Sequence, residues 1–191
     1  FLIHAVKSCI RQNYKKKEII FFDDKSTDNS LSKIKELNKI SKQKISIVTN
    51  PNKKVNFPSI NHIEAIRKGL KKTKGKYVFL LDSDDYFHKN KIKEIIEIFN
   101  KNEKVHFVLN NPILKYKKKE IKKKFESKFI KNRWPKFPPT SCMCFEKKTL
   151  TNVLKKIEPK KFPNLAIDFR LAVYYSVILK KFFIHQSYLT F

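Results

Sequence analysis

Two short apolar runs in this sequence each end in a cluster of acidic residues. The first run, within residues 18–22, leads into Asp23 and Asp24. The second, residues 77–81, leads into the stretch Asp-Ser-Asp-Asp that begins at Asp82. A short apolar run bounded by turn-forming residues is typical of a strand buried on both faces of a sheet. Because ligands of open α/β sheets bind at the carboxyl ends of the strands, the two clusters are expected to share one crevice.

Helical and strand-like patterns alternate around these two runs. Apolar residues make up 41 % of the 191 residues, which is enough for one hydrophobic core. Alternation of this kind predicts an α/β fold with a mostly parallel sheet. Residues 110–139, rich in Lys and Pro, are expected to form a loop or a mobile lobe. We expect helices at 1–12, 31–37, 58–70, 89–100, 148–157 and 166–179, and strands at 18–22, 45–48, 77–81, 105–109, 140–145 (antiparallel) and 182–185.

The chain is strongly basic, with 44 Lys and Arg against 17 Asp and Glu and a formal net charge of +27. Such a balance is typical of proteins that bind nucleic acid or an anionic membrane. However, Lys, Ile, Phe and Asn together make up about half of the sequence, and all four have codons made only of A and T. An AT-rich genome places Lys on the surface whatever the function. The net charge therefore does not distinguish between these functions, and the distinction must come from sequence motifs.

The spacing of the acids in the second cluster is typical of a metal site. Asp82 and Asp84 are two residues apart where the chain turns after a strand. They can converge on one hard cation, Mg²⁺ or Mn²⁺, which takes its other ligands from water and substrate phosphates. With only two glycines, the sequence contains no glycine-rich phosphate loop, so a metal and basic side chains must hold any phosphate. The alternative is that such acids only form turns and helix N-caps.

Three segments together resemble family 2 glycosyltransferases. They are SCIRQNY from Ser8 to Tyr14, EIIFFDDKSTDNS from Glu18 to Ser30, and GKYVFLLDSDD from Gly75 to Asp85. The resemblance is best over residues 1–40 and 59–90 and weak over 105–139. It implies a GT-A-like fold, a mostly parallel sheet flanked by helices in three layers, α/β/α. It also implies a single domain over 1–191, with a nucleotide-binding half at 1–109 and an acceptor-side half at 110–191.

In this family a further strand precedes the helix that corresponds to residues 1–12. That strand is not in the sequence, so the chain is expected to be a fragment or a trimmed product.

The resemblance also implies roles for the acidic residues. Asp23 and Asp24 would lie beside the nucleotide base, and Asp82 would face the ribose or the sugar. Asp84 would bind the Mg²⁺ or Mn²⁺ ion that bridges the diphosphate, with Asp85 next to it.

Asn61 and Asp168 complete the implied site. Asn61 takes the place of an Arg contact that the family often has near the start of its third helix. Asp168 stands where the family has its catalytic base, usually the second residue of Glu-Asp, although Ile167 precedes it here. The alternative for Asp168 is an ordinary acid in the first turn of a helix, where the helix dipole favours it.

The implied reaction moves a hexosyl group from a nucleoside-diphosphate sugar, with a UDP-sugar as first choice, to an acceptor hydroxyl with inversion. The acceptor would be a glycan or a lipid-linked molecule in bacterial surface glycan synthesis. The protein would be cytoplasmic and could lie at the inner face of the cytoplasmic membrane, where the Lys-rich run 115–124 could make a peripheral contact.

Competing interpretations are a basic nucleic-acid-binding module, another Mg²⁺-dependent nucleotidyl or phosphotransfer enzyme, and a degenerate binding module without turnover. No nucleic-acid-binding motif is present, and we expect no nucleic-acid partner.

Two further side chains have open roles at this point. Trp134, beside Arg133 in the irregular basic segment, would either stack on an acceptor sugar or anchor the loop in the core. His185, in the last expected strand, could ligate a metal or touch phosphate, although a partly buried structural histidine is the better interpretation.

Overall fold

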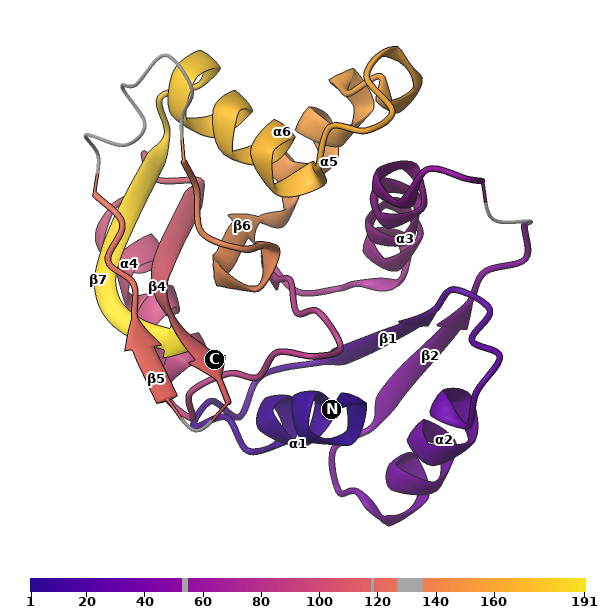
Figure 1. Ribbon diagram of the computed structural model, residues 1–191. Helices are drawn as coiled ribbons and strands as arrows, with labels where there is room; N and C mark the ends of the chain where they lie inside the picture. The colour runs from indigo at the N-terminus through magenta and orange to yellow at the C-terminus, as the bar shows by residue number, and fades with distance from the viewer. Residues whose placement is uncertain (53–54, 118, 127–135) are drawn as a thin grey trace.

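The computed structural model describes residues 1–52, 55–117, 119–126 and 136–191 (Figure 1). Arg133 and Trp134 lie outside the described residues, so their roles stay predictions. The first half contains α1 (Leu2–Ile10), β1 (Ile19–Asp23), α2 (Ser30–Ile40), β2 (Ile45–Thr49), α3 (Pro58–Lys72), β3 (Tyr77–Phe79) and α4 (Lys91–Lys101). The second half contains β4 (Phe107–Tyr116), β5 (Lys119–Lys122), the 3₁₀ turn η2 (Thr140–Cys142), β6 (Met143–Glu146), α5 (Lys147–Lys156), the 3₁₀ turn η3 (Pro159–Lys161), α6 (Ile167–Val173), the π-helical turn η4 (Tyr174–Ile178) and β7 (Phe182–Thr190). Every predicted helix and strand has a counterpart, with boundaries shifted by a few residues.

The described strands form two sheets. β1 and β2 pair in parallel, from Ile19 opposite Ile45 to Asp23 opposite Thr49. The larger sheet has the order β3-β6-β4-β5, and β7 pairs with β4 in parallel. β6 runs antiparallel to both β3 and β4, as the sequence predicts for this segment. The parallel pairing expected from the alternating pattern is thus found in β1–β2 and β4–β7, and antiparallel pairs join the rest of the larger sheet.

Helices cover both faces of the larger sheet, because side chains alternate along its strands. On one face, α4 packs Ile95 and Phe99 against Val108 and Cys144. On the other face, α3, α5 and α6 pack against the alternate residues of the same strands. That second cluster includes Ile63, Phe107, Phe145, Leu150 and Leu171. The result is the predicted three-layer α/β/α arrangement. The apolar faces of the helices on both sides pack against the sheet.

The described residues of the segment 110–139, namely 110–117, 119–126 and 136–139, differ from the predicted loop in containing two strands. β4 continues to Tyr116 and turns back into β5, with Leu114 opposite Ile121. Two side chains at its start are fully buried: Asn110 Nδ2 donates to Thr190 Oγ1 (3.0 Å), and Asn111 Nδ2 donates to the Gln186 carbonyl (2.9 Å). These partners are more than seventy residues away in the sequence, so local composition does not reveal them.

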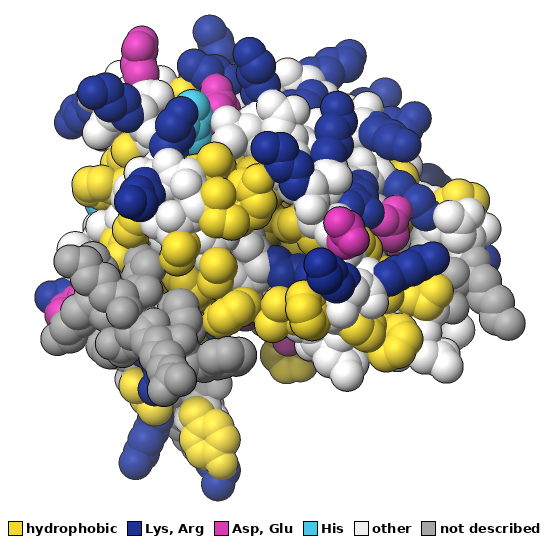
Figure 2. Space-filling view, turned by 90° about the horizontal axis from the view of Figure 1, so that it is seen from above, with side chains coloured by type: hydrophobic (Ala, Val, Ile, Leu, Met, Phe, Trp, Pro, Cys, Tyr) yellow, Lys and Arg dark blue, Asp and Glu magenta, His cyan; other side chains and the backbone are white. Residues whose placement is uncertain are grey.

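Basic side chains are dispersed over the surface. On the face seen from above, Lys and Arg cover several separate areas among hydrophobic side chains, and acidic side chains are few (Figure 2). A nucleic-acid-binding surface typically has its basic side chains gathered in one patch or stripe. The basic side chains on this face form no such stripe. This distribution favours the interpretation that many of the surface lysines reflect an AT-rich genome and not a binding function.

Candidate functional site

The Asp82–Asp85 turn follows β3 and is held by a buried serine. The backbone N–H of Asp82 donates to Ser141 Oγ (2.9 Å), and the N–H of Asp85 donates to the Asp82 carbonyl (3.3 Å). Ser141 is fully buried in η2, and its side chain opposes the rise that burial causes in the pKa of the Asp85 carboxyl. The Ser141 hydroxyl therefore holds the Asp82 end of the turn, while Asp84 is exposed to solvent.

The environment of Asp82 links three parts of the chain. Burial raises the pKa of the Asp82 carboxyl, and His62 on α3, with Nε2 3.7 Å from Asp82 Oδ1, opposes that rise. The charges of Asp85, Asp84 and Asp168 each raise the pKa of Asp82 further. The structure thus brings Asp168, at the start of α6, within electrostatic reach of a turn more than eighty residues earlier. A concentration of acids like this one is stabilised by a cation.

Asp168 lies in the first turn of α6 and is half-buried. Its Oδ1 accepts a hydrogen bond from the N–H of Phe169 (2.7 Å). The helix is anchored by Ile167 and Leu171 in the core and by Arg170, whose Nε donates to the Leu165 carbonyl (2.9 Å). Asp168 is therefore held on a packed element near the aspartate turn, and its position is compatible with either of the two roles considered above.

The first acidic pair forms a separate polar cluster at the end of β1. Asp23 is buried, and its Oδ1 accepts from the N–H of Ser26 (3.2 Å). Asn50, after β2, donates from Nδ2 to Asp24 Oδ1 (2.5 Å), and Lys68 Nζ donates to Asn50 Oδ1 (2.7 Å). Asp23 thus shapes the turn that presents Asp24.

Helix α3 connects the two acidic clusters. Lys68 on α3 contacts the Asp24–Asn50 cluster, while His62 on the same helix faces Asp82. The two residues are six positions apart, which is roughly 9 Å along a helix axis. Both clusters therefore contact one helix, and the expectation that they share one crevice stays a prediction.

Asn61 has both of its side-chain polar groups engaged locally. Its Oδ1 accepts from the N–H of Val55 (3.1 Å), and its Nδ2 donates to the Val55 carbonyl (2.8 Å). The side chain therefore holds the loop that enters α3. Its predicted contact with the donor stays a prediction, and that contact would require one of these bonds to be exchanged.

The donor set of the aspartate turn fits a hard divalent cation. It consists of carboxylate oxygens, and Mg²⁺ typically takes one or two of these together with substrate phosphates. Within the part of the chain that the structure describes, no three His, Cys, Asp or Glu side chains are grouped so as to hold a metal on their own. A cation at this turn would therefore depend on oxygens from the substrate.

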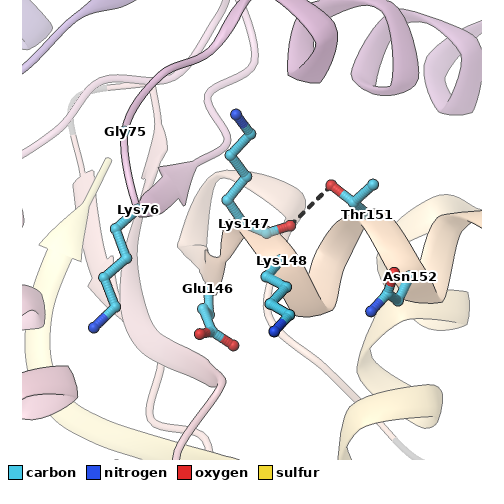
Figure 3. Close-up of a pocket in the computed structure, with 7 residues that line it drawn as sticks. All are labelled: Gly75, Lys76, Glu146, Lys147, Lys148, Thr151 and Asn152. Atoms are coloured by element: carbon cyan, nitrogen blue, oxygen red, sulfur yellow. Dashed lines mark hydrogen bonds between the residues drawn. The ribbon is translucent and has the colours of Figure 1, made fainter.

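A cavity of about 320 Å³ lies elsewhere, at the opposite end of β3 (Figure 3). Gly75 and Lys76, which precede β3, line it together with Glu146, Lys148 and other residues at the start of α5. Asp82 follows the other end of the same strand, so this cavity contains none of the predicted site residues.

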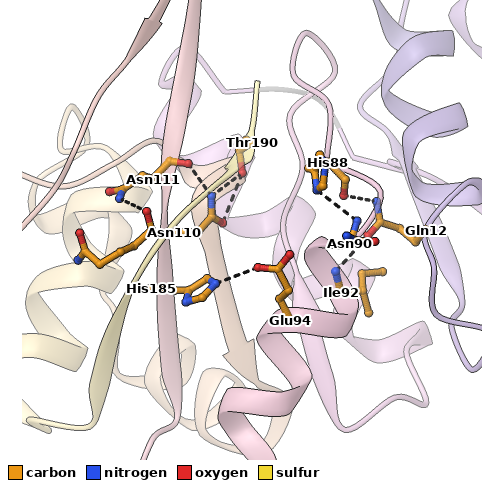
Figure 4. A network of polar contacts seen from close by, with 10 residues as sticks. Gln12, His88, Asn90, Ile92, Glu94, Asn110, Asn111, His185 and Thr190 are labelled. Carbon is orange, nitrogen blue, oxygen red and sulfur yellow. Dashed lines mark hydrogen bonds and ion pairs between the residues drawn. The ribbon is translucent and has the colours of Figure 1, made fainter.

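His185 is part of a structural contact. Its Nε2 lies 3.1 Å from Glu94 Oε2 on α4, and the two side chains point toward each other (Figure 4). This pairing joins β7 to α4 and agrees with the structural interpretation of His185.

The sequence did not single out Ser141, His62 or Lys91 as parts of the site. Ser141 stands in the expected strand 140–145, within the half of the chain that the family resemblance places at the acceptor side, and this was the one available signal. No sequence pattern separates His62 or the buried Lys91 from the other polar residues of their helices.

Solved structures share this architecture. The chain superposes over all of its length on S. aureus TarS 1-349 in complex with UDP, with a TM-score of 0.72, 15 % identity and 55 % of that chain covered. It also superposes on the mannosyltransferase PcManGT from Pyrobaculum calidifontis in complex with GDP-Man and Mn²⁺, with a TM-score of 0.64, 11 % identity and coverage of 97 % of this chain and 51 % of that one. The fold is therefore that of the GT-A glycosyltransferases.

The chain belongs to glycosyl transferase family 2, whose sequence profile matches residues 1–157. A relative in *Escherichia coli*, the UDP-Glc:alpha-D-GlcNAc-diphosphoundecaprenol beta-1,3-glucosyltransferase WfaP, is 39 % identical over 107 residues. That match covers 56 % of this chain and 39 % of the relative. The chain thus spans about half or less of the length of the proteins compared with it here.

Across the described residues, no helix combines the length and the apolar character needed to cross a bilayer.

Proposed function

We propose that this chain is the single catalytic domain of an inverting, metal-dependent glycosyltransferase in bacterial surface glycan synthesis. It would move a hexosyl group from a nucleoside-diphosphate sugar to an acceptor hydroxyl. The observation that supports this best is that Asp168 lies within electrostatic reach of Asp82, at the start of the Asp82–Asp85 turn. Residues 1–109 would bind the nucleotide, and residues 110–191 would face the acceptor.

Each acid has a distinct proposed role. Asp23 and Asp24 would contact the base, and Asp82 the ribose or the sugar. Asp84 would hold Mg²⁺ or Mn²⁺ against the diphosphate, with Asp85 beside it. When bound, the cation neutralises charge on the departing nucleoside diphosphate.

The transfer would be a single displacement. The acceptor oxygen attacks the anomeric carbon, and the bond from that carbon to the phosphate oxygen breaks on the opposite side, which inverts the sugar. Asp168 takes the proton of the acceptor hydroxyl as the new bond forms. The carboxylate of Asp168 is free for this at the oxygen that does not accept from Phe169.

Donor binding is the direct test of the proposal. We expect UDP-glucose, UDP-GlcNAc or GDP-mannose to bind the purified protein with Mn²⁺ present and to bind weakly after chelation with EDTA. Isothermal titration calorimetry with each donor measures this, and product mass then identifies the sugar transferred. A folded protein that binds none of the three in Mn²⁺ would contradict the proposal.

We also propose a peripheral membrane contact at the β4–β5 hairpin. Its inner face packs on aromatic rings: Lys115 Nζ lies 5.2 Å from the Tyr86 ring centroid and 5.3 Å from that of Phe191. Its outer face carries Tyr116 and Ile121, which are 64 % and 52 % exposed, on the same side as Lys119 because they alternate with the inward residues. Exposed apolar and basic side chains on one face fit the surface of an anionic bilayer, which would carry a lipid-linked acceptor.

Flotation with vesicles tests this contact. The protein is expected to float with phosphatidylglycerol vesicles and not with phosphatidylcholine vesicles. Lys119→Ser should lower vesicle binding about fivefold, since one basic residue near such a surface contributes about 1 kcal/mol. Ile40→Ser, which changes an 82 % exposed residue on α2, serves as the control. Equal flotation with neutral vesicles would contradict a contact that depends on anionic lipid. Concentration-dependent self-association without lipid that Lys119→Ser abolishes would contradict a membrane role for this face.

A further inference from the structure

Lys91, the first residue of α4, is a fully buried lysine (0 % exposed). Its Nζ donates to the Ser141 carbonyl (2.5 Å) and to Thr190 Oγ1 (2.8 Å), and it lies 4.0 Å from the centroid of the Phe87 ring. Ammonium groups are almost never fully buried unless they are paired. This lysine therefore calls for an explanation beyond the packing of its methylene groups.

The direct partners of Lys91 are polar but uncharged. The ionisable groups that face it are the thiols of Cys9 on α1, Cys142 in η2 and Cys144 on β6, together with the Asp85 carboxyl. Burial raises the pKa of all three thiols, to about 11 for Cys9 and Cys142 and about 12 for Cys144, so they are neutral. Among these groups, only Asp85 can supply a compensating negative charge. Burial lowers the pKa of the Lys91 ammonium, and the charge of Asp85 opposes that fall.

Ser141 connects Lys91 to that turn. Its carbonyl accepts from Lys91, while its hydroxyl accepts from the N–H of Asp82 (2.9 Å). The Asp82 end of the turn is therefore held by a residue that Lys91 itself contacts. Thr190 closes the arrangement from β7, because its hydroxyl accepts from Lys91 and from Asn110 Nδ2 (3.0 Å).

We propose that Lys91 is a positioning residue for the donor site: its buried Nζ fixes the Ser141 carbonyl, and through the Ser141 hydroxyl it fixes the start of the Asp82–Asp85 turn. The Asp84 carboxylate is then presented outward, toward the cation and the diphosphate. This inference rests on the proposed function, because it assigns Lys91 to the same cation–diphosphate site.

Three variants separate this role from simple packing. Lys91→Met keeps the length of the side chain and removes the charge. Ser141→Ala leaves Lys91 and its carbonyl partner in place and removes only the link to the aspartates. Lys93→Met, an exposed lysine on the same helix, is the matched control.

The measurements are the dissociation constant of UDP in saturating Mn²⁺, the affinity for Mn²⁺ by electron paramagnetic resonance, and the melting temperature. We expect Lys91→Met and Ser141→Ala each to weaken Mn²⁺-dependent UDP binding by about 10- to 100-fold, the range typical of residues that orient metal ligands. The double variant is expected to lose little more than either single variant, because both changes break one chain of contacts. Lys93→Met should bind as the wild type does.

The outcomes are distinguishable. If the wild type does not bind UDP and Mn²⁺ together, the proposed function fails. If the wild type binds and Ser141→Ala binds equally well at a temperature where it is folded, the positioning role of Lys91 is wrong and the proposed function stands. A fall in melting temperature with unchanged Mn²⁺ affinity would likewise reduce Lys91 to a structural residue. Should Lys91→Met fail to fold, Ser141→Ala decides alone.

Discussion

Replacing Asp84 by Asn is expected to remove Mn²⁺-dependent donor binding while leaving the fold intact. Asp84 is exposed on the turn after β3, and its change to an amide of the same size disturbs no buried contact. Its charge raises the pKa of both Asp82 and Asp85, so removing it relieves repulsion among the three carboxylates. Thermal stability should therefore be equal or slightly higher, which separates a site effect from unfolding.

The expected loss of transfer in Asp84→Asn is about 10³-fold, since stabilisation of charge by a metal ion in the transition state amounts to several kcal/mol. Calorimetry with UDP and Mn²⁺ measures the binding step, and UDP release from the donor measures turnover. Glu97→Gln, which changes an exposed acid on α4, controls for the loss of one negative charge. If Asp84→Asn kept wild-type affinity for UDP in Mn²⁺, the metal would not be held at this turn.

The fold was largely predictable because its buried helices and strands have recognisable local patterns of apolar residues. The helical spacing of Ile92, Ile95 and Phe99 predicts a helix with one inward face, and α4 packs that face against the sheet. The apolar run before Asp82 likewise predicts β3. In these segments the periodicity of the side chains and the tertiary packing favour the same structure, so sequence patterns suffice.

The β4–β5 hairpin shows where this reasoning stops. Asn110, Asn111 and the following Pro resemble a turn, and the Lys-rich stretch beyond resembles a solvated loop. Their strand conformation depends instead on partners in β7, at Gln186 and Thr190. Hydrogen bonds across such sequence separations leave no local pattern, and a long-range partner can override a turn propensity.

The same limit applies to the candidate site. The positions of Asp82, Asp84 and Asp85 follow from the end of an apolar strand and were predicted. The roles of Lys91 and Ser141 were not predicted. In a chain with 44 Lys and Arg residues, nothing in the sequence distinguishes a buried lysine from an exposed one. Their contribution becomes visible only when α4, η2 and the turn are seen together.

Replacing Asp168 by Asn is the second large effect that we expect, and it should fall on transfer alone. Removing a general base typically lowers the rate by about 10²- to 10⁴-fold. The amide oxygen of Asn can still accept from the N–H of Phe169, so the first turn of α6 should be retained. Because a carboxylate near the aspartate turn repels an anionic diphosphate, donor affinity is expected to be unchanged or slightly higher.

Two readouts make the assignment of Asp168 decisive. UDP affinity in Mn²⁺ by calorimetry reports the donor site, and product formation with the donor–acceptor pair identified by product mass reports the chemistry. Transfer retained by Asp168→Asn would rule Asp168 out as the base. An equal loss of donor affinity would show instead that its charge acts by shaping the aspartate turn, since Asp168 and Asp82 are electrostatically linked.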